Sequence, residues 1–448
     1  MEPKLQKNLF KLMIPIFVEM ALFILMGTID TLMISNYENT RIYAIGSVAA
    51  VGNASTVINL FGVLINVIST GVGVIVSQYL GAKKREEANK TIGTGIIIQI
   101  AVGLTLMVLL ISLGNLLFQL IGTPVEIKDF AYQYLFYGAI GIVFAALTSA
   151  MNAGLRSYGK GMTIMVSAAI ANVGNVLFNI VFIYGFWFIP EMGVAGASIA
   201  TVLMRIMTFI IALIFLKKYV GFHILKSRIY PYILKQILRI GLPSALENMT
   251  YNVLQFVVLS FVNILGQDII TARTYTSTIA SYMFLFSGSF ASANAIITGY
   301  FVGEKDYDSA YKNTHKTVRT ALMVVLTVVL FINIFADPLI GLLTKNSDVA
   351  VQIKNALRVY FLISIGGVFN LVYIQALRSC NDTKFPLIMA VISMLGIGVP
   401  MAYIFAIVLD LKLAGIFLGL ASDELFRGIM MLFRFKSKKW LNYVEIGG

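Results

Sequence analysis

Tyr79–Lys90 reads YLGAKKREEANK, and Phe301–Lys312, 222 residues further along the chain, reads FVGEKDYDSAYK. Laid over each other without a gap, the two stretches have glycine, lysine and alanine at matching positions, and Gly81 falls on Gly303. Each stretch connects two long apolar runs. The pair therefore predicts a chain built from two related halves, each with a basic loop at the same place.

Two further matches extend the repeat. At the same offset of 222, Leu155–Ser157 falls on Leu377–Ser379, and both read LRS. The starts of the halves match at an offset of 228, through Lys7, Lys11, Pro15 and Glu19 in the first half and Lys235, Arg239, Pro243 and Glu247 in the second. One offset that holds across two separate loops indicates a duplicated fold rather than chance similarity.

The composition indicates that the natural solvent of this chain is lipid. Of 448 residues, 58% are hydrophobic and 12% are charged, and the mean hydropathy is +0.86, whereas a soluble domain carries about twice that charge fraction. Charge-free runs such as 42–82 and 385–409 exceed the roughly 20 residues that a helix needs to cross a membrane. The weak alternation of a membrane barrel is absent. We therefore predict an all-α integral membrane protein.

We predict twelve transmembrane helices, six in each half. They cover residues 9–35, 43–80, 91–121, 130–155, 161–186, 193–216, 236–265, 270–302, 313–343, 348–378, 385–409 and 412–434. Because six is an even number, both halves begin on the same side of the membrane, so the repeat is parallel, as in transporters built from two rocking lobes. The predicted domains are an N-lobe (1–216), a cytoplasmic linker (217–235), a C-lobe (236–435) and a cytoplasmic tail (436–448).

Lysine and arginine are distributed unevenly among the predicted connections. The N-terminus, the even-numbered loops and the C-terminal tail hold 25 of the 34, whereas the odd-numbered loops and the adjoining helix ends hold seven. The positive-inside rule then predicts a multi-pass protein of the plasma membrane with both termini in the cytoplasm. The net charge of +13 reflects this orientation, and no nucleic-acid partner is expected. Trp187 and Trp440 are expected at opposite membrane edges.

Few residues are available for metal or covalent chemistry. Cys380 is the only cysteine, and His223 and His315 lie in basic connecting segments. This pattern argues against disulfides, thiolate metal clusters and a histidine metal site. The chain has no G-x4-G-K-[ST] nucleotide motif. Any pumping therefore requires an ion gradient, and we expect no cofactor beyond a coupling ion, H⁺ or Na⁺.

Asp30 lies in the long apolar stretch LMIPIFVEMALFILMGTIDTLMIS (Leu12–Ser35), where Glu19 is the only other charge. Burial removes the hydration of a carboxylate and favours its neutral form, so a proton or a sodium ion changes its state. Pro15, about 22 Å earlier along the helix, leaves one backbone carbonyl unpaired and permits a bend. We interpret Asp30 as an ion-coupling residue linked to a hinge. The alternative is a structural acid held by asparagine amides of another helix.

Several short motifs occur in a fixed order along nearly the whole chain. They are P-x3-E-x10-D (Pro15, Glu19, Asp30), Gly-Ala-Lys (Gly81–Lys83), LRS-x-G-K (Leu155–Lys160) and LRSCNDTKFP (Leu377–Pro386). Together they resemble the MATE family, the multidrug and toxic compound extrusion transporters of the MOP flippase superfamily. The last motif is similar to the L-R-G-x-G-D-T-x-x-P of that family.

The resemblance implies two parallel-repeat six-helix lobes around a central cavity. It also implies a secondary active antiporter that exports cationic or amphipathic organic compounds in exchange for H⁺ or Na⁺ by alternating access. In the family, the first-helix acid couples to the ion together with polar residues of helices five and six. By position these are Asp30, Asn175, Asn179 and Thr201. Some branches have an acid at the position of Asn179, which this chain lacks, so a sodium site with two carboxylates is in doubt. Na⁺ at Asp30 is the one metal that we consider.

Other polar residues in the spans are candidate contacts for substrate or for a second ion. They are Glu19, Glu247, Tyr37, Asn152, Tyr282 and Asn294, with Pro15 and Pro243 as the hinges. Glu19 and Glu247 each follow a proline by one turn near basic residues, so a structural ion pair is the alternative for both. For the tyrosines and asparagines the alternative is ordinary packing and interhelical hydrogen bonding.

The predicted twelfth helix carries Asp423, Glu424 and Arg427. Glu424 and Arg427 are i,i+3 neighbours and are expected to neutralise each other, which leaves Asp423 without a local partner. Arg205 lies at the matching depth of the sixth helix and is a candidate to pair with it. We interpret this group as structural.

Two other functions fit parts of the pattern. A lipid-linked oligosaccharide flippase of the same superfamily needs a cationic cavity, but the charges within the spans comprise five acids and two arginines, which favours a cationic cargo. A membrane-embedded transferase needs a convergent acid, base or nucleophile, and the chain has no HExxH, no DxD and no catalytic cysteine. We therefore expect a transporter and not an enzyme, a monomer whose partners are small organic cations and membrane lipid.

Overall fold

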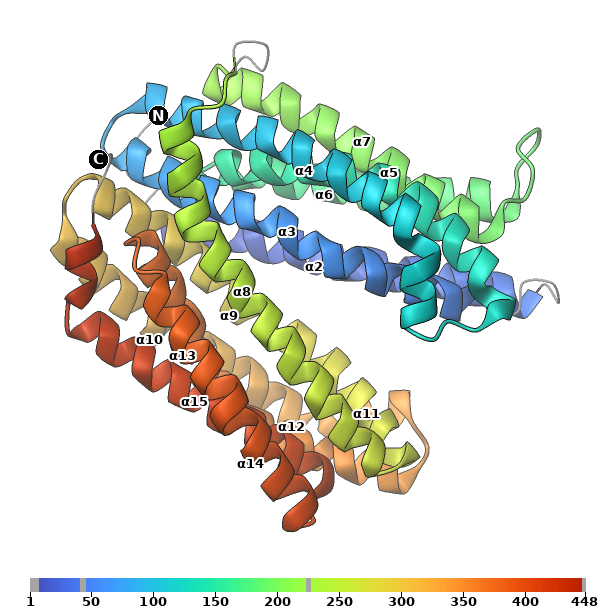
Figure 1. Ribbon diagram of the computed structural model, residues 1–448. Helices are drawn as coiled ribbons and strands as arrows, with labels where there is room; N and C mark the ends of the chain where they lie inside the picture. Colours follow the sequence, from blue (N-terminus) through green and yellow to red (C-terminus); the bar gives the residue numbers. More distant parts are fainter. Residues whose placement is uncertain (1–7, 41–45, 223–226, 445–448) are drawn as a thin grey trace. The chain divides into compact units, whose positions relative to one another are not determined.

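The computed structural model describes residues 8–40, 46–222 and 227–444, which form helices joined by short loops (Figure 1). The elements are α2 (Leu9–Thr40), α3 (Ser47–Gly81), α4 (Arg85–Leu120), α5 (Val125–Ser157), α6 (Gly161–Tyr184), α7 (Gly193–Val220), α8 (Pro231–Ile264), α9 (Gln267–Gly303), α10 (Tyr307–Ile334), α11 (Ala336–Leu343), α12 (Ser347–Ser379), α13 (Lys384–Ser393), η3 (Met394–Gly398), α14 (Val399–Tyr403), η4 (Ile404–Val408), α15 (Lys412–Lys436) and η5 (Lys439–Tyr443). The described residues contain no strand beyond one isolated bridge between Phe186 and Ile189.

Ten of the described helices are long and apolar enough to cross a membrane, with α13 to η4 counted as one. The other two long helices, α8 and α15, carry charges near their middle, at Glu247 and at Asp423. With these two, the helices match the twelve predicted segments, and the predicted all-α membrane architecture is confirmed. Large apolar side chains such as Phe23 and Phe256, 71% and 73% exposed, lie on the outer surfaces of the helices, as expected for contact with lipid.

One predicted helix, 313–343, is divided in two. α10 ends at Ile334 and α11 begins at Ala336, with Phe335 between them. Pro338 lies in the first turn of α11 and has no amide hydrogen to donate to the carbonyl of Ile334. The prediction of one continuous helix was wrong because the proline interrupts the hydrogen-bond ladder at this point.

The predicted helix 385–409 is unbroken but irregular. Two π-helical turns, η3 and η4, lie on either side of the five-residue α14. Pro400 is the second residue of α14, and its missing amide hydrogen removes one α-helical hydrogen bond. Prolines and π-turns are the usual local causes of irregularity within a helix.

Packing divides the described residues into two compact units. The N-terminal unit comprises residues 18–40, 46–76, 84–222 and 227–241, and the C-terminal unit comprises residues 8–17, 77–83 and 242–444. In the N-terminal unit, α5 packs against α4 and α7, and α6 packs against α7 (Figure 1). In the C-terminal unit, α12 packs against α9, α10 and α15. The unit boundaries fall inside α2, α3 and α8, so each of these helices has residues in both units.

The glycine of the repeated basic loop has a packing role within the C-terminal unit. Gly81 ends α3, and Gly303 ends α9. A Cβ atom on Gly81 would overlap the backbone carbonyl of Tyr300, and a Cβ atom on Gly303 would overlap the carbonyl of Gln78. The two helix ends therefore touch backbone to backbone, which explains why both halves have glycine at this position.

The segment after α15 packs onto its own unit. Trp440 is fully buried, its Nε1 donates to the carbonyl oxygen of Phe435 at 3.0 Å, and the two rings stack with centroids 5.3 Å apart. The Trp440 ring is therefore covered by protein and is not free to anchor at an interface, and its position at a membrane edge stays a prediction. Trp187, by contrast, is 91% exposed on the connection between α6 and α7.

Candidate functional site

Asp30 lies on α2 and is buried in the N-terminal unit, with 8% of its surface exposed. Asn179 Nδ2 donates to Asp30 Oδ1 at 2.6 Å and to Asn175 Oδ1 at 3.1 Å. The two asparagines are one turn apart on α6 and are fully buried, so their side chains share the face that meets α2. The structure thus brings three of the predicted ion-coupling residues into one hydrogen-bonded group.

Thr201, the fourth predicted residue of this group, approaches Asp30 from α7. Its side chain interacts with the Asp30 carboxylate, and its Oγ1 donates to the carbonyl of Ala197 at 3.1 Å. The group therefore draws its side chains from three helices, α2, α6 and α7. We call Asp30, Asn175, Asn179 and Thr201 the Asp30 group.

Two buried atoms of the Asp30 group have no hydrogen-bond partner among the described residues, Asn179 Oδ1 and Asn175 Nδ2. The Asn175 side chain interacts with the Asp30 carboxylate as Thr201 does, so the group offers one spare acceptor, Asn179 Oδ1, beside the carboxylate. A protonated Asp30 can donate to an amide oxygen, and a sodium ion would be bound by one carboxylate with amide and hydroxyl oxygens. In the described part of the chain, no three His, Cys, Asp or Glu side chains are grouped as a metal site.

Arg205 is a neighbour of the Asp30 group that the sequence did not indicate. Its charge acts on Asp30, although the described residues show no direct ion pair between the two side chains. Its Nη1 donates to the carbonyl of Gly138 at 3.5 Å, and a Cβ atom on Gly141 would lie 3.1 Å from the Arg205 side chain. Arg205 therefore lies along α5 where glycine leaves room for it. The available signal was its i,i+4 spacing from Thr201 on α7.

Glu19 and Glu247 each form an ion pair with the arginine of an LRS motif. Glu19 Oε1 accepts from Arg156 Nη2 at 2.5 Å in the N-terminal unit, and Glu247 Oε2 accepts from Arg378 Nη2 at 2.7 Å in the C-terminal unit. The two pairs correspond to each other in the internal repeat. This geometry agrees with the ion-pair interpretation of both acids, in which a proline-containing helix is joined to the helix that ends in LRS.

The remaining candidate contacts do not converge on Asp30. Tyr37 is buried against Tyr184, with ring centroids 6.1 Å apart, at one end of the N-terminal unit. Asn152 is half-buried on α5, and Tyr282 is 40% exposed on α9. Asn294 is fully buried between α9 and α10, where its Nδ2 donates to Thr314 Oγ1 at 3.4 Å. The contacts of Tyr37 and Asn294 agree with packing and hydrogen bonding between helices, and the roles of Asn152 and Tyr282 stay predictions.

The acids of α15 are arranged differently from the prediction. Arg427 pairs with both of them, since its Nε and Nη2 donate to Asp423 at 3.0 and 2.7 Å and its Nη2 also donates to Glu424 Oε1 at 2.5 Å. Asp423 further accepts from Ser393 Oγ at 2.6 Å. The expected Glu424–Arg427 pair is confirmed, whereas the expectation that Asp423 lacks a local partner, with Arg205 as a candidate to pair with it, is wrong. An i,i+4 pair within α15 provides its counter-charge.

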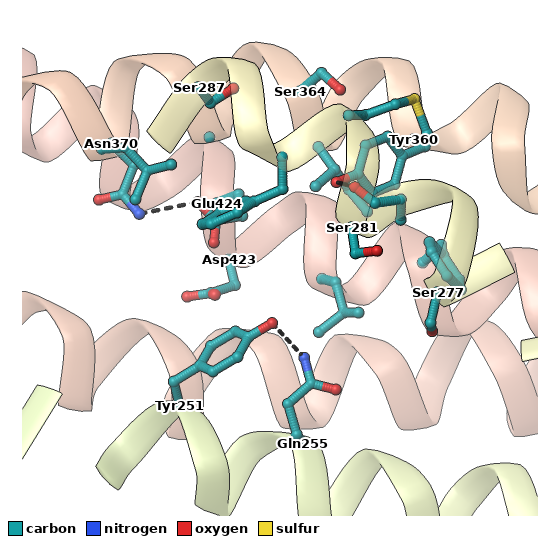
Figure 2. A pocket seen from close by; sticks show the side chains of 18 of the residues that line it. Tyr251, Gln255, Ser277, Ser281, Ser287, Tyr360, Ser364, Asn370, Asp423 and Glu424 are labelled. Atoms are coloured by element: carbon teal, nitrogen blue, oxygen red, sulfur yellow. Dashed lines mark hydrogen bonds between the residues drawn. The ribbon is translucent and has the colours of Figure 1, made fainter. Parts of the chain in front are cut away.

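The C-terminal unit also contains a cavity of about 850 Å³ that the sequence did not reveal (Figure 2). Its lining comes from α8, α9, α12, η3 and α15 and includes Glu247, Tyr251, Gln255, Ser277, Ser281, Tyr360, Asn370, Asp423 and Glu424. The i,i+4 serines Ser277 and Ser281 mark one polar face of a charge-free stretch of α9. That pattern was the available signal for a polar cavity within the membrane.

Comparisons with known proteins agree on one family. The MatE family model matches residues 15–181 and 243–404. The chain is 33% identical to the "Uncharacterized transporter YisQ" of Bacillus subtilis over 447 residues, covering 97% of this chain and 95% of that protein. It is 26% identical to the "Probable multidrug resistance protein NorM" of Thermotoga maritima, covering 98% and 94%.

Solved structures show the same fold. The structure described as "Crystal structure of MATE in the bent conformation" superposes with a TM-score of 0.87 at 22% identity, covering 98% of this chain and 97% of that chain. A second, "Outward-facing conformation of a multidrug resistance MATE family transporter of the MOP superfamily", gives a TM-score of 0.87 at 22% identity and covers 98% of each chain. Such structures have twelve helices in two lobes.

Proposed function

The chain belongs to the MatE family of multi-pass membrane transporters. We propose that it is a secondary active antiporter for multidrug efflux. It exports cationic or amphipathic organic compounds in exchange for H⁺ or Na⁺ by alternating access. Proteins of this family are transporters and not enzymes. Similarity to the multidrug resistance protein of Thermotoga maritima supports the class of substrate.

We place the protein in the plasma membrane as a monomer with both termini in the cytoplasm. The excess of lysine and arginine in the N-terminus, the even-numbered loops and the C-terminal tail supports this orientation. The proposed lobes are residues 1–216 and 236–435, joined by the basic linker 217–235 and followed by the tail 436–448. Its partners are small organic cations and membrane lipid.

The observation that carries the proposal is the environment of Asp30. This buried carboxylate receives a hydrogen bond from a neutral amide at 2.6 Å and, among the described residues, makes no direct ion pair. A carboxylate without a bound counter-charge inside a membrane protein is costly. Binding of a proton or a sodium ion removes that cost, so occupancy of Asp30 by the ion is linked to which arrangement of the surrounding helices is favoured.

Pro15 and Pro243 are the proposed hinges. Pro15 lies three residues before α2 enters the N-terminal unit at Val18, and Pro243 is the second residue of α8 that belongs to the C-terminal unit. Each proline leaves one backbone carbonyl of its helix unpaired and permits a bend there. A bend at these points lets one end of a helix move with a different unit from the other end.

The experiment uses proteoliposomes, a fluorescent organic cation and an imposed proton or sodium gradient. The wild type is expected to move the dye under one of the gradients, which identifies the ion. Asp30→Asn is expected to abolish gradient-driven movement, because an amide cannot take up a proton at neutral pH and provides no charge for sodium. Asp129→Asn, which changes an exposed aspartate of the same unit, is the matched control and keeps transport.

Two outcomes would contradict the proposal. Equal gradient-driven transport by Asp30→Asn and the wild type removes Asp30 as the coupling residue. Failure of both gradients to move any cationic dye through the wild type removes the proposed substrate class, and an anionic lipid-linked cargo is then the next one to test.

A further inference from the structure

The cavity of the C-terminal unit has the size and lining of a binding site for a small organic molecule. Its volume of about 850 Å³ falls within the range of roughly 300–1,000 Å³ typical of such sites. We propose that it binds an aromatic organic monocation that carries N–H groups, with the Glu424 carboxylate as its counter-ion. This inference rests on the proposed function, the export of organic cations. It concerns equilibrium binding within one unit and does not depend on ion coupling at Asp30.

Glu424 carries the unbalanced charge of the cavity. The side chains of Asp423 and Arg427, 2% and 3% exposed, form a two-point ion pair, and Ser393 completes the hydrogen bonding of the aspartate. Two acids and one arginine leave one negative charge. Glu424 is the more accessible acid, with 19% of its side chain exposed, and it accepts a single hydrogen bond at each oxygen, from Arg427 and from Asn370. A cation in the cavity would therefore meet Glu424.

The lining holds two other charged residues, Glu247 and Arg273, and neither is among the charges that act on Glu424. Glu247 is paired with Arg378. Arg273 lies near the start of α9 and donates to Gln255 Oε1 at 3.1 Å. The charges that act on Glu424 are those of Arg427 and Asp423. The Glu424 end of the cavity is therefore negative.

Two buried acceptors in the lining point to a ligand with donor groups. Asn370 Oδ1 and Ser364 Oγ, on residues 1% and 5% exposed, have no hydrogen-bond partner in the described parts of the chain. Both residues line the cavity, and Asn370 also donates to Glu424 Oε2 at 2.9 Å (Figure 2). A buried acceptor without a donor is unfavourable. An N–H group of the ligand, close to its cationic centre, could donate a hydrogen bond to such an acceptor. The proposed ligand therefore carries N–H groups.

The walls of the cavity suit a flat aromatic cation. Tyr251 on α8 and Phe284 on α9 line it and are accessible, with 42% and 48% of their surfaces exposed. Aromatic faces attract cations and stack on aromatic rings.

The first test measures ethidium binding to the whole protein in nanodiscs, without any gradient, by fluorescence anisotropy, with empty nanodiscs as the background. Ethidium is flat, singly charged and carries amino groups. The wild type is expected to bind it, and Glu424→Gln to bind at least about tenfold more weakly because the counter-ion is lost. Asp348→Asn removes an exposed acid of the same unit that does not line the cavity, and it is expected to bind as the wild type does.

Glu424→Asp keeps the charge and is expected to recover most of the affinity that Glu424→Gln loses. Wild-type affinity in Glu424→Gln would overturn the proposal. So would absence of ethidium binding to the wild-type protein. Transport assays are separate from these measurements, so a failure of coupling at Asp30 and a failure of this site give different patterns of results.

A second measurement keeps the proposal testable if Glu424→Gln does not fold. Ser281→Cys introduces a thiol into the cavity lining, while the native Cys380 is buried. Ethidium is expected to slow maleimide labelling of Ser281→Cys and to leave labelling of Ser260→Cys unchanged, because Ser260 is exposed on α8 outside the cavity. Equal labelling of Ser281→Cys with and without ethidium would overturn the proposal.

Discussion

Arg205 of the N-terminal unit and Arg427 of the C-terminal unit are 222 residues apart and occupy equivalent positions of the internal repeat. They differ in how they interact with neighbouring carboxylates. Arg427 makes close ion pairs with two carboxylates of its own helix. Arg205 acts on Asp30, which lies on another helix, without a direct ion pair among the described residues. At the position equivalent to Asp423, the first half has Thr201.

The difference separates an acid that can change its state from acids whose state is fixed. An i,i+4 ion pair within one helix keeps its geometry whatever the neighbouring helices do. Asp30, held by a neutral amide, depends on the positions of α6 and α7 for its environment. The first arrangement suits a permanent negative site, and the second suits a site whose ion occupancy is linked to helix movement.

The largest expected effect on stability comes from replacing the two arginines. Arg427→Met is expected to lower the free energy of unfolding by about 3–5 kcal/mol, because two buried carboxylates lose their counter-charge. Arg205→Met is expected to cost less than half as much, since Arg205 makes one hydrogen bond, at 3.5 Å, within the described residues. Thermal unfolding of the purified variants, followed by intrinsic fluorescence, measures both. Equal losses would show that Arg205 has a direct acidic partner.

The two repeat-related ion pairs offer a second comparison. The Glu247–Arg378 side chains are 11% and 10% exposed, whereas those of Glu19 and Arg156 are 17% and 32% exposed. Glu247→Gln is therefore expected to destabilise the protein by about 2 kcal/mol and Glu19→Gln by about 1 kcal/mol, because solvent screens the second pair more. The same thermal unfolding assay ranks them. The reverse order would mean that burial does not control the strength of these pairs.

Asp30→Asn and Asp423→Asn test whether the two acids have different roles. Asp30→Asn is expected to affect transport far more than stability. The amide oxygen of an asparagine still accepts from Asn179, and no direct ion pair with Asp30 is lost among the described residues. We expect a change in unfolding free energy below about 1 kcal/mol, together with the loss of gradient-driven transport. Asp423→Asn makes the same replacement of a carboxylate by an amide. This variant is expected to unfold at a clearly lower temperature than the wild type, since it disrupts the ion pair with Arg427. Comparable destabilisation by both variants would assign Asp30 a structural role.

The smallest expected effect concerns Cys380, which follows α12 and is fully buried. Burial raises the pKa of its thiol well above the usual value, and Asp382 adds to the increase. A thiol stays protonated below its pKa, so raising the pH from about 7 to about 9 should leave maleimide labelling of the native protein near zero. A surface thiol introduced by Ser347→Cys should react faster as the pH rises. Rapid labelling of Cys380 at the higher pH would show that its segment opens.

Local patterns predicted the helices well, but individual interruptions less well. Apolar runs identified the long helices, including α8 and α15, which carry charges near their middle. A backbone in lipid must form its hydrogen bonds within the segment, which favours helices. The break between α10 and α11 was also a local effect, of Pro338, and could have been recognised from the sequence. The burial of Trp440 could not, because it depends on the stacking of the chain end onto Phe435.

In the candidate site, too, features within one helix could be predicted from the sequence, whereas contacts between helices could not. The i,i+4 spacing of Asn175 and Asn179 is a local feature, and the family resemblance connected both with Asp30. No local feature connects Arg205 with Asp30, Arg156 with Glu19 or Arg378 with Glu247, since each pair lies on different helices. The cavity of the C-terminal unit needs side chains from several helices and has no single sequence motif.

From the sequence alone we predicted a lipid environment, twelve long helices, the internal duplication and a buried acid at Asp30. These follow from composition and spacing, which act over a few turns of one helix. The packing of the helices decided which charges on different helices meet, as in the Glu19–Arg156 pair, and where a cavity remains. The physical reason is rotational: each residue turns about 100° around a helix axis, so the partner of a side chain depends on how neighbouring helices are rotated and crossed.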